Sequence, residues 1–235
     1  MECTRTLVII DQALGHEALG IVNRYLRNIK VVEDPTGKGR ETYRSERARI
    51  HNTLLAERWP VMLSIYQEMI VKPDELQMTS RPLNIHPSRP EIPGMYYDTG
   101  PLISDSESAG MQGGTLHFMT EGIDQGPLIR VLEAPVAEGY RYPEVRRRNQ
   151  EFCLELLEWT CSAIVRSDGL EAFDRKLSQE IAQLQNRRWG TYIDTPTRDR
   201  RLLALHQQDP THPALVGNKK FEKVLRRSAV SRGVV

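Results

Sequence analysis

The fold is indicated by one short apolar run, Thr6-Leu7-Val8-Ile9-Ile10. A run of β-branched and aliphatic residues without polar alternation is typical of a strand buried on both faces, as in a parallel sheet. Apolar residues then recur at helical spacing over 14–27, and a second short strand is predicted at 29–32. Together these segments predict a β-α-β unit.

The alternation of strand and helix continues along the chain. Further strands are predicted at 60–65, 83–86, 115–119 and 128–132, and further helices at 41–59, 72–76 and 143–166. This order is typical of an α/β protein with a mostly parallel sheet and helices on both faces. Residues 1–168 are therefore predicted to form one α/β domain.

Residues 169–235 are predicted to form a helical or irregular C-terminal extension. It contains an amphipathic helix after Gly169 and a possible short strand at 190–193. From residue 196 onward, nine Lys and Arg residues stand against three Asp and Glu residues, with little apolar periodicity. A basic tail can bind polyanions, but a solvated, partly disordered end is the favoured interpretation.

Composition limits the class of protein. The formal net charge is +1 over 235 residues, which gives no reason to expect a nucleic-acid or membrane partner. Cys3, Cys153 and Cys161 form no C-x-x-C pair, so free thiols in a reducing compartment are expected. The apolar run Leu7 to Ile10 is too short for a signal peptide or a membrane span, and a cytoplasmic protein is predicted.

Two polar segments at predicted strand ends carry the candidate chemistry: Asn84-Ile85-His86-Pro87-Ser88 and residues 114–127, which include Asp124. Residues two apart on a strand share a face, so the side chains of Asn84 and His86 point the same way. An amide can donate to a developing oxyanion, an imidazole can carry a proton, and a carboxylate can raise the pKa of that imidazole. The set suits acyl transfer without a covalent enzyme intermediate, and Ser88 lacks the context of a nucleophile elbow.

Other interpretations stay open at this point. His86, His117 and Asp124 would also suit a zinc site, and His117 alone is more typical of a core or supporting group. The set could also be purely structural, although an Asn and a His at a strand end are poor core material. The loop 34–40 holds two glycines and two basic residues and could cradle a phosphate, but an ordinary loop is favoured.

The two segments resemble those of the 10-formyltetrahydrofolate-dependent formyltransferases, closest to the glycinamide ribonucleotide formyltransferase type. The likeness lies in Asn84-x-His86-Pro87-Ser88, Gly94, and Gly114-Thr115-x-His117 with Gly122-x-Asp124-x-Gly126-Pro127, within residues 5–170. The resemblance implies a Rossmann-like formyltransferase fold. It also implies transfer of a formyl group from 10-formyltetrahydrofolate, the formyl donor, to a primary amine of a small molecule.

The resemblance also implies roles for individual residues. The amine attacks the formyl carbon, Asn84 and His86 steady the tetrahedral oxyanion, and Asp124 sustains a charged His86. The folate is expected to lie against two loops, whose residues are Met69, Ile70 and Val71 in one and Thr120, Glu121, Gly122 and Asp124 in the other. The substrate is expected to meet Arg89, Gly94 and His117, and no metal is expected.

The sequence departs from this family in ways that concern the acceptor. Thr6–Ile10 looks like the family's second strand, so the first β-α unit, with its phosphate-gripping Gly-Ser-Asn loop, is expected to be missing. A bare strand edge would follow, which residues 190–193 or a second subunit of a homodimer would cover. Arg89-Pro90 and a longer segment from Gly94 to Thr115 indicate a rebuilt acceptor pocket. An amino sugar, a hydroxylated amino acid or a modified nucleoside is therefore the expected acceptor; a folate-dependent hydrolase and a non-catalytic folate- or partner-binding relative are the alternatives.

Overall fold

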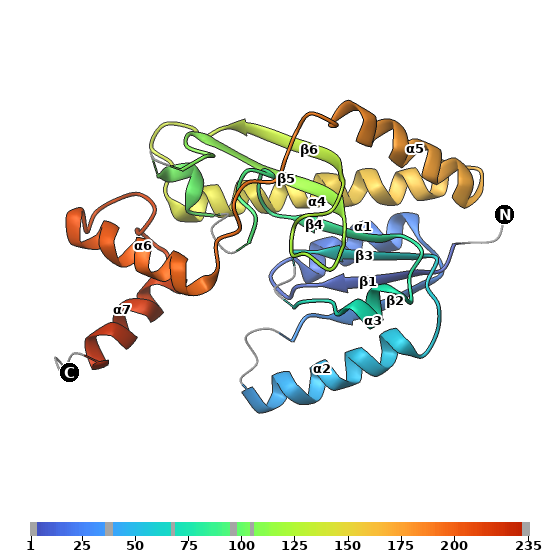
Figure 1. Cartoon of the computed structure of the whole chain (residues 1–235), viewed down its shortest axis with the longest axis horizontal. Helices are drawn as coiled ribbons and strands as arrows, with labels where there is room; N and C mark the ends of the chain where they lie inside the picture. Colours follow the sequence, from blue (N-terminus) through green and yellow to red (C-terminus); the bar gives the residue numbers. More distant parts are fainter. Residues whose placement is uncertain (1–3, 36–39, 67–68, 95–97, 104–105, 232–235) are drawn as a thin grey trace.

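A computed structural model describes residues 4–35, 40–66, 69–94, 98–103 and 106–231. Its centre is a six-stranded sheet with the strand order β2-β1-β3-β4-β5-β6 (Figure 1). The strands β1 to β4 run parallel to one another. At one edge of the sheet β5 pairs antiparallel with β4, and β6 pairs antiparallel with β5. The strands are β1 (Thr6–Ile10), β2 (Ile29–Glu33), β3 (Val61–Ile65), β4 (Pro82–His86), β5 (Met111–Phe118) and β6 (Leu128–Pro135).

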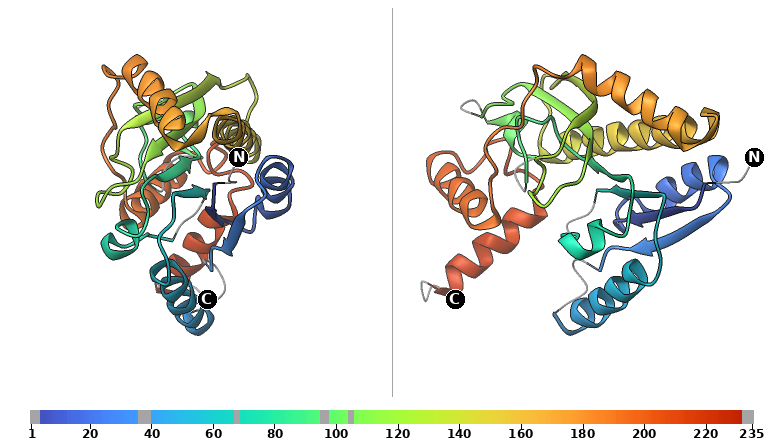
Figure 2. Two further views of the ribbon diagram at one scale, coloured as in Figure 1. Left: turned by 90° about the vertical axis from the view of Figure 1, so that its right-hand side faces the viewer. Right: turned by 45° about the vertical axis from the view of Figure 1, so that its right-hand side comes forward.

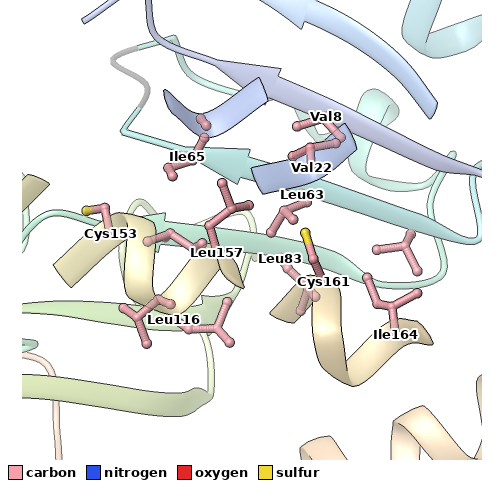
Figure 3. Close-up of a cluster of buried hydrophobic side chains, with 14 of the residues drawn as sticks. Val8, Val22, Leu63, Ile65, Leu83, Leu116, Cys153, Leu157, Cys161 and Ile164 are labelled. Atoms are coloured by element: carbon pink, nitrogen blue, oxygen red, sulfur yellow. The ribbon is translucent and has the colours of Figure 1, made fainter. Parts of the chain in front are cut away.

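Helices cover both faces of the sheet, which confirms the predicted α/β class. One face packs against α1, α4 and α5 through a cluster that includes Val8, Leu83 and Leu157 (Figure 3). The opposite face packs against α2 through Leu7, Ile9, Ile50 and other apolar residues. The helices are α1 (Gly15–Tyr25), α2 (Arg40–Leu55), α3 (Pro73–Leu76), α4 (Tyr142–Arg166), α5 (Gly169–Gln183), α6 (Thr195–Gln208) and α7 (Lys219–Ser231), with a 3₁₀ turn at Gly100–Leu102.

The strand β1 is paired on both of its edges. Val8 lies opposite Val31 of β2 and opposite Leu63 of β3. The predicted bare edge is therefore wrong, and no second subunit is needed to cover it. The predicted strand at 190–193 is also wrong, because only an isolated bridge joins Ile193 to Gly94.

Two element boundaries differ by four residues from the sequence-based prediction. The helix α2 ends at Leu55 rather than at 59, and the backbone N–H of Trp59 donates to the carbonyl of Met78 instead. The strand β5 begins at Met111, four residues before the predicted start. The start of β5 was not predicted because Gly113 and Gly114 lie there and glycine is a weak strand former. Glycine is needed at position 114 because a side chain there would meet Phe152 of α4.

The C-terminal end is folded, contrary to the predicted solvated tail. The helices α6 and α7 share a small core with the segment that follows β4, and Figure 2 shows both helices standing to one side of the sheet. Neither helix is strongly apolar alone, and part of the core comes from more than a hundred residues earlier in the chain. The buried members of this core are Ile92, Ile103, Leu202, Ala214, Leu215, Phe221 and Val224.

The two cysteines in the described residues, Cys153 and Cys161, are free and buried within α4. Burial raises the pKa of the Cys153 thiol well above its usual value and that of Cys161 to about 12, so both are unreactive. Cys3 lies outside the described residues. None of the helices in the described part of the chain combines the length and apolarity needed to cross a membrane.

Candidate active site

The polar residues of the site lie on one face of the sheet. Leu83 and Ile85 of β4 point into the core under α4, so Asn84 and His86, which alternate with them, point to the opposite face. Ser64 of β3 and His117 of β5 both lie beside Asn84 in the strand register. Three neighbouring strands thus bring four polar side chains together, as expected at the ends of parallel strands.

The amide of Asn84 is held in one orientation. The carbonyl of Phe118 lies 2.8 Å from Nδ1 of His117 and can only accept, so that nitrogen carries the proton. In neutral His117, Nε2 is then an acceptor, and Nδ2 of Asn84 donates to it over 3.0 Å. The hydroxyl of Ser64 donates to Oδ1 of Asn84 over 2.9 Å. One N–H of Asn84 remains for a ligand.

His86 is buried between two acceptors. Its Nδ1 lies 3.4 Å from Oδ2 of Asp124, and its Nε2 lies 3.1 Å from the carbonyl oxygen of Ile92. Burial lowers the pKa of His86, and the charge of Asp124 raises it; the net direction is down. The carboxylate therefore acts in the predicted sense, but burial outweighs it.

Asp124 lies in the loop between β5 and β6, in the left-handed conformation with φ of +48°. Its Oδ2 accepts from the backbone N–H of Gly94 over 2.9 Å, and its Oδ1 lies 3.6 Å from Nε2 of His117. Burial alone would raise the pKa of Asp124, but His86, His117 and the Gly94 N–H hold it well below its usual range. Asp124 is thus ionised at neutral pH.

A cavity of about 410 Å³ opens beside these groups. It brings together every predicted site residue except Arg89. The predicted residues in its wall are Met69, Ile70, Val71, Asn84, His86, Gly94, His117, Thr120, Glu121, Gly122 and Asp124. Arg89 instead donates to Glu133 over 2.6 Å and lies 3.4 Å from Glu91, away from the cavity wall.

Several residues at the site carried no sequence signal. Tyr43 comes from α2, Tyr66 follows β3 with φ of +56°, and Tyr192 and Thr195 come from the C-terminal extension. Tyr192 and Thr195 lie outside the segments that resemble a family. Only the position of Tyr66, directly after a buried strand, could have suggested a site residue.

The structure bears on two alternative interpretations, the zinc site and the phosphate loop. The described residues contain no group of three or more His, Cys, Asp or Glu side chains arranged to hold a metal ion, so the zinc interpretation gains no support. For the suggested phosphate loop, residues 36–39 lie outside those that the structure describes.

Comparison with known proteins identifies the fold. No protein-family model and no curated protein matches the sequence. An N-formyltransferase from Helicobacter canadensis, solved with folinic acid and dTDP-3-aminofucose, matches with a TM-score of 0.57 at 13% identity, over 83% of this chain and 72% of that one. A formyltransferase from Anoxybacillus kamchatkensis, solved with UDP-4,6-dideoxy-4-formamido-L-AltNAc and tetrahydrofolate, matches with a TM-score of 0.53 at 16% identity, over 90% and 95%.

Phosphoribosylglycinamide formyltransferase from Streptococcus pneumoniae also matches, with a TM-score of 0.55 at 17% identity, over 68% of this chain and 98% of that one. The expected loss of the first β-α unit stays a prediction. In this chain Thr6–Ile10 forms the inner strand β1, which is flanked by β2 and β3. The chain therefore has the Rossmann-like fold of the formyltransferases.

Proposed function

We propose that the protein is an N-formyltransferase that moves the formyl group of 10-formyltetrahydrofolate to a primary amine of a small molecule. The observation that carries this proposal is the arrangement of Asn84, His86 and Asp124 at one cavity. An oriented amide N–H, a buried imidazole and an ionised carboxylate meet there. The fold shared with formyltransferases of known structure supports the same activity.

The cavity suits a folate. Part of its wall is apolar and comes from Met69, Ile70, Val71, Leu76 and Met119. Ile70 of this wall is 59% exposed, so its apolar surface is available for a flat ring to cover. The volume lies in the range of sites for small organic ligands. The loop from Thr120 to Asp124 would hold the folate largely by backbone groups.

The chemistry follows from the positions of the protons. When the amine nitrogen adds to the formyl carbon, negative charge develops on the formyl oxygen, and the remaining N–H of Asn84 is available to donate to it. The amine must lose a proton, and a buried, neutral His86 can accept one. Ionised Asp124 stabilises the imidazolium that results. Proton return to the folate nitrogen then accompanies cleavage of its bond to the formyl carbon.

The acceptor class is part of the proposal. Sugar-nucleotide ligands in the related structures favour an amino sugar among the candidate amines. Gly94 and His117 remain candidate acceptor contacts because they line the cavity. Arg89 is not a candidate contact, since its guanidinium is engaged with Glu133 and Glu91.

The test is direct. The protein is incubated with 10-formyltetrahydrofolate and a panel of amines, and mass spectrometry looks for a product heavier by one formyl group. We expect such a product, with rates reduced about 10²- to 10³-fold or more in His86→Ala and Asp124→Asn. Equal formate release without any amine would instead support the hydrolase. Folate binding without turnover on any amine would support the non-catalytic relative.

A further inference from the structure

We propose that the segment connecting α5 and α6, residues 184–194, completes the active site on the acceptor side. In this proposal Tyr192 contacts the amine acceptor, and Trp189 is a positioning residue for the histidines. The inference rests on the proposed function and goes beyond it, because it makes the C-terminal extension part of the machinery that selects the amine. Figure 1 shows the connecting segment as the orange trace that passes β6 and β5 on its way from α5 to α6.

The connecting segment is fastened to the loop that follows β4. The guanidinium of Arg187 donates to both carboxylate oxygens of Glu91, over 3.0 and 3.1 Å, and to Glu133 over 2.7 Å. The backbone N–H of Gly190 donates to the carbonyl of Pro90 over 2.9 Å. Bidentate contacts of this kind fix geometry as well as adding energy. The segment therefore has a defined path across the site.

Trp189 packs against both histidines of the site. The centroid of its indole lies 4.8 Å from that of His117 and 6.1 Å from that of His86, with interplanar angles of 78° and 71°. Its Nε1–H donates to the carbonyl of Gly126 over 2.7 Å, in the loop that carries Asp124. The side chain of Trp189 thus packs against both imidazoles and holds the loop of Asp124, the carboxylate that lies beside both of them.

Tyr192 is placed to meet a ligand. Its ring packs directly on Gly94, where an added Cβ would lie 2.6 Å from the ring, and the side chain lines the cavity while 38% exposed. Burial and the nearby charge of Asp124 both raise the pKa of its hydroxyl, so the phenol stays protonated and can donate. Thr195 adds a second hydroxyl-bearing side chain to the same wall.

The cavity has an apolar wall and a hydroxyl-bearing wall, and we infer that each binds a different ligand. The apolar side chains come from the β3–α3 region and from Met119, and they suit the ring of the formyl donor. Tyr192 and Thr195 bring hydroxyl groups beside Gly94, whose N–H holds Asp124. An acceptor that carries hydroxyl groups next to its amine would exchange hydrogen bonds with this wall. We therefore assign the connecting segment to a hydroxylated primary amine rather than to the folate.

The experiment uses the full chain, an accepted amine from the panel, and folinic acid as the donor analogue. Tyr192→Ala is expected to raise the KM for a hydroxylated acceptor at least tenfold, and Tyr192→Phe severalfold. Both should leave the Kd for folinic acid within twofold of the parent value. Thr195→Ala is expected to act in the same direction. An unchanged acceptor KM in both Tyr192 variants, or a matching loss of folinic acid binding, would overturn the assignment.

Trp189 is tested separately because its effect should fall on kcat. Trp189→Phe keeps a ring but removes the N–H that holds the loop of Asp124, so kcat should fall about tenfold with the acceptor KM unchanged. Trp159→Phe is the matched control, since Trp159 packs under Arg130 and Lys176 away from the cavity. Equal kcat in Trp189→Phe and the control would reject the positioning role. If the parent protein formylates no amine, the proposed function itself fails, which is a different result from unaltered variants of an active enzyme.

Discussion

Ser64 donates its hydroxyl hydrogen to Oδ1 of Asn84 across the pair formed by β3 and β4. The two oxygens lie 2.9 Å apart, and Ser64 is completely buried. Because Oδ1 is occupied in this way and Nδ2 meets His117, the amide cannot turn without losing both hydrogen bonds. The direction of the free N–H of Asn84 is thus set by two neighbours on the adjacent strands.

We expect Ser64→Ala to lower kcat about tenfold, which corresponds to about 1.4 kcal/mol, the upper end of the range for one hydrogen bond. The acceptor KM should change little, because Ser64 lies behind Asn84. Ser167→Ala is the control, since it removes a hydroxyl that donates to the helical carbonyl of Ala163. Steady-state kinetics of both variants make the test; a kcat as high as that of the control would show that Ser64 does not orient the amide.

Much of the sheet follows from local pattern. The run Thr6–Ile10 and the helical spacing after it specify a β-α-β unit, and the period of two on β4 places Asn84 and His86 on one face. The position of β1 within the sheet cannot be predicted from this pattern, because a strand buried on both faces has the same apolar sequence in any inner position. That is why the sequence suggested a bare strand edge, whereas β1 pairs with a neighbouring strand on both edges.

The extension was the least predictable part, for a physical reason. Phe221 and Val224 share a core with Ile92 and Ile103, so no short window contains all the residues that fold them. For Arg89 the sequence predicted a ligand contact that the structure does not contain, since a basic residue beside a catalytic motif suggests such a contact. Its actual partners, Glu133 and Glu91, form an ion-pair cluster with Arg187 that no spacing rule reveals.

The titration of His86 gives a test of the site's electrostatics. Burial lowers its pKa below the usual value of about 6.5 even though Asp124 raises it. We therefore expect NMR to show His86 titrating below free histidine, with its signal assigned by its loss in His86→Gln. In Asp124→Asn the opposing charge is gone, so the pKa should fall further. A rise of that pKa in the variant would contradict the account.

Gly94 offers a test of the contact with Tyr192. Gly94→Ala would place a methyl group against that ring and at φ of +81°, so we expect a loss of stability beyond the backbone strain, together with a higher acceptor KM. Gly110→Ala is a matched control, because its φ of +71° is similar and nothing lies within 4 Å of the added Cβ. The control should lose about 1–2 kcal/mol and keep its activity.

The steric part of that prediction can be isolated. In the double variant Gly94→Ala with Tyr192→Ala the clash with the ring is absent, although the carbonyl of Ile193 still lies 2.8 Å from the added Cβ. The loss of stability in the double variant should therefore be smaller than the sum of the two single losses. Urea unfolding of the four proteins measures the coupling. Strict additivity would mean that Tyr192 does not press on Gly94 in solution.

Asp98 is predicted to make the fold less stable as the pH rises. It is buried between α4 and the C-terminal helices, where Tyr142 and Arg146 lie 3.4 and 3.6 Å from its Oδ2. Burial raises its pKa to about 6, against the lowering effect of Arg146 and Lys220. Since the unfolded chain has a pKa of about 4 for this group, the folded state binds more protons between pH 4 and 6.

The contribution of Asp98 is thus fully present below about pH 4 and is lost as the pH rises through 6. The size is about 3 kcal/mol for a difference of roughly two pKa units. Asp98→Asn keeps the shape but cannot ionise, so the free energy of unfolding of the wild type relative to this variant should fall by that amount between pH 4 and 7. Urea unfolding of both proteins at each pH makes the comparison. A difference that stays constant would show that the fold does not raise the pKa of Asp98, and one that grows with pH would show that Arg146 and Lys220 outweigh the cost of burying the charge.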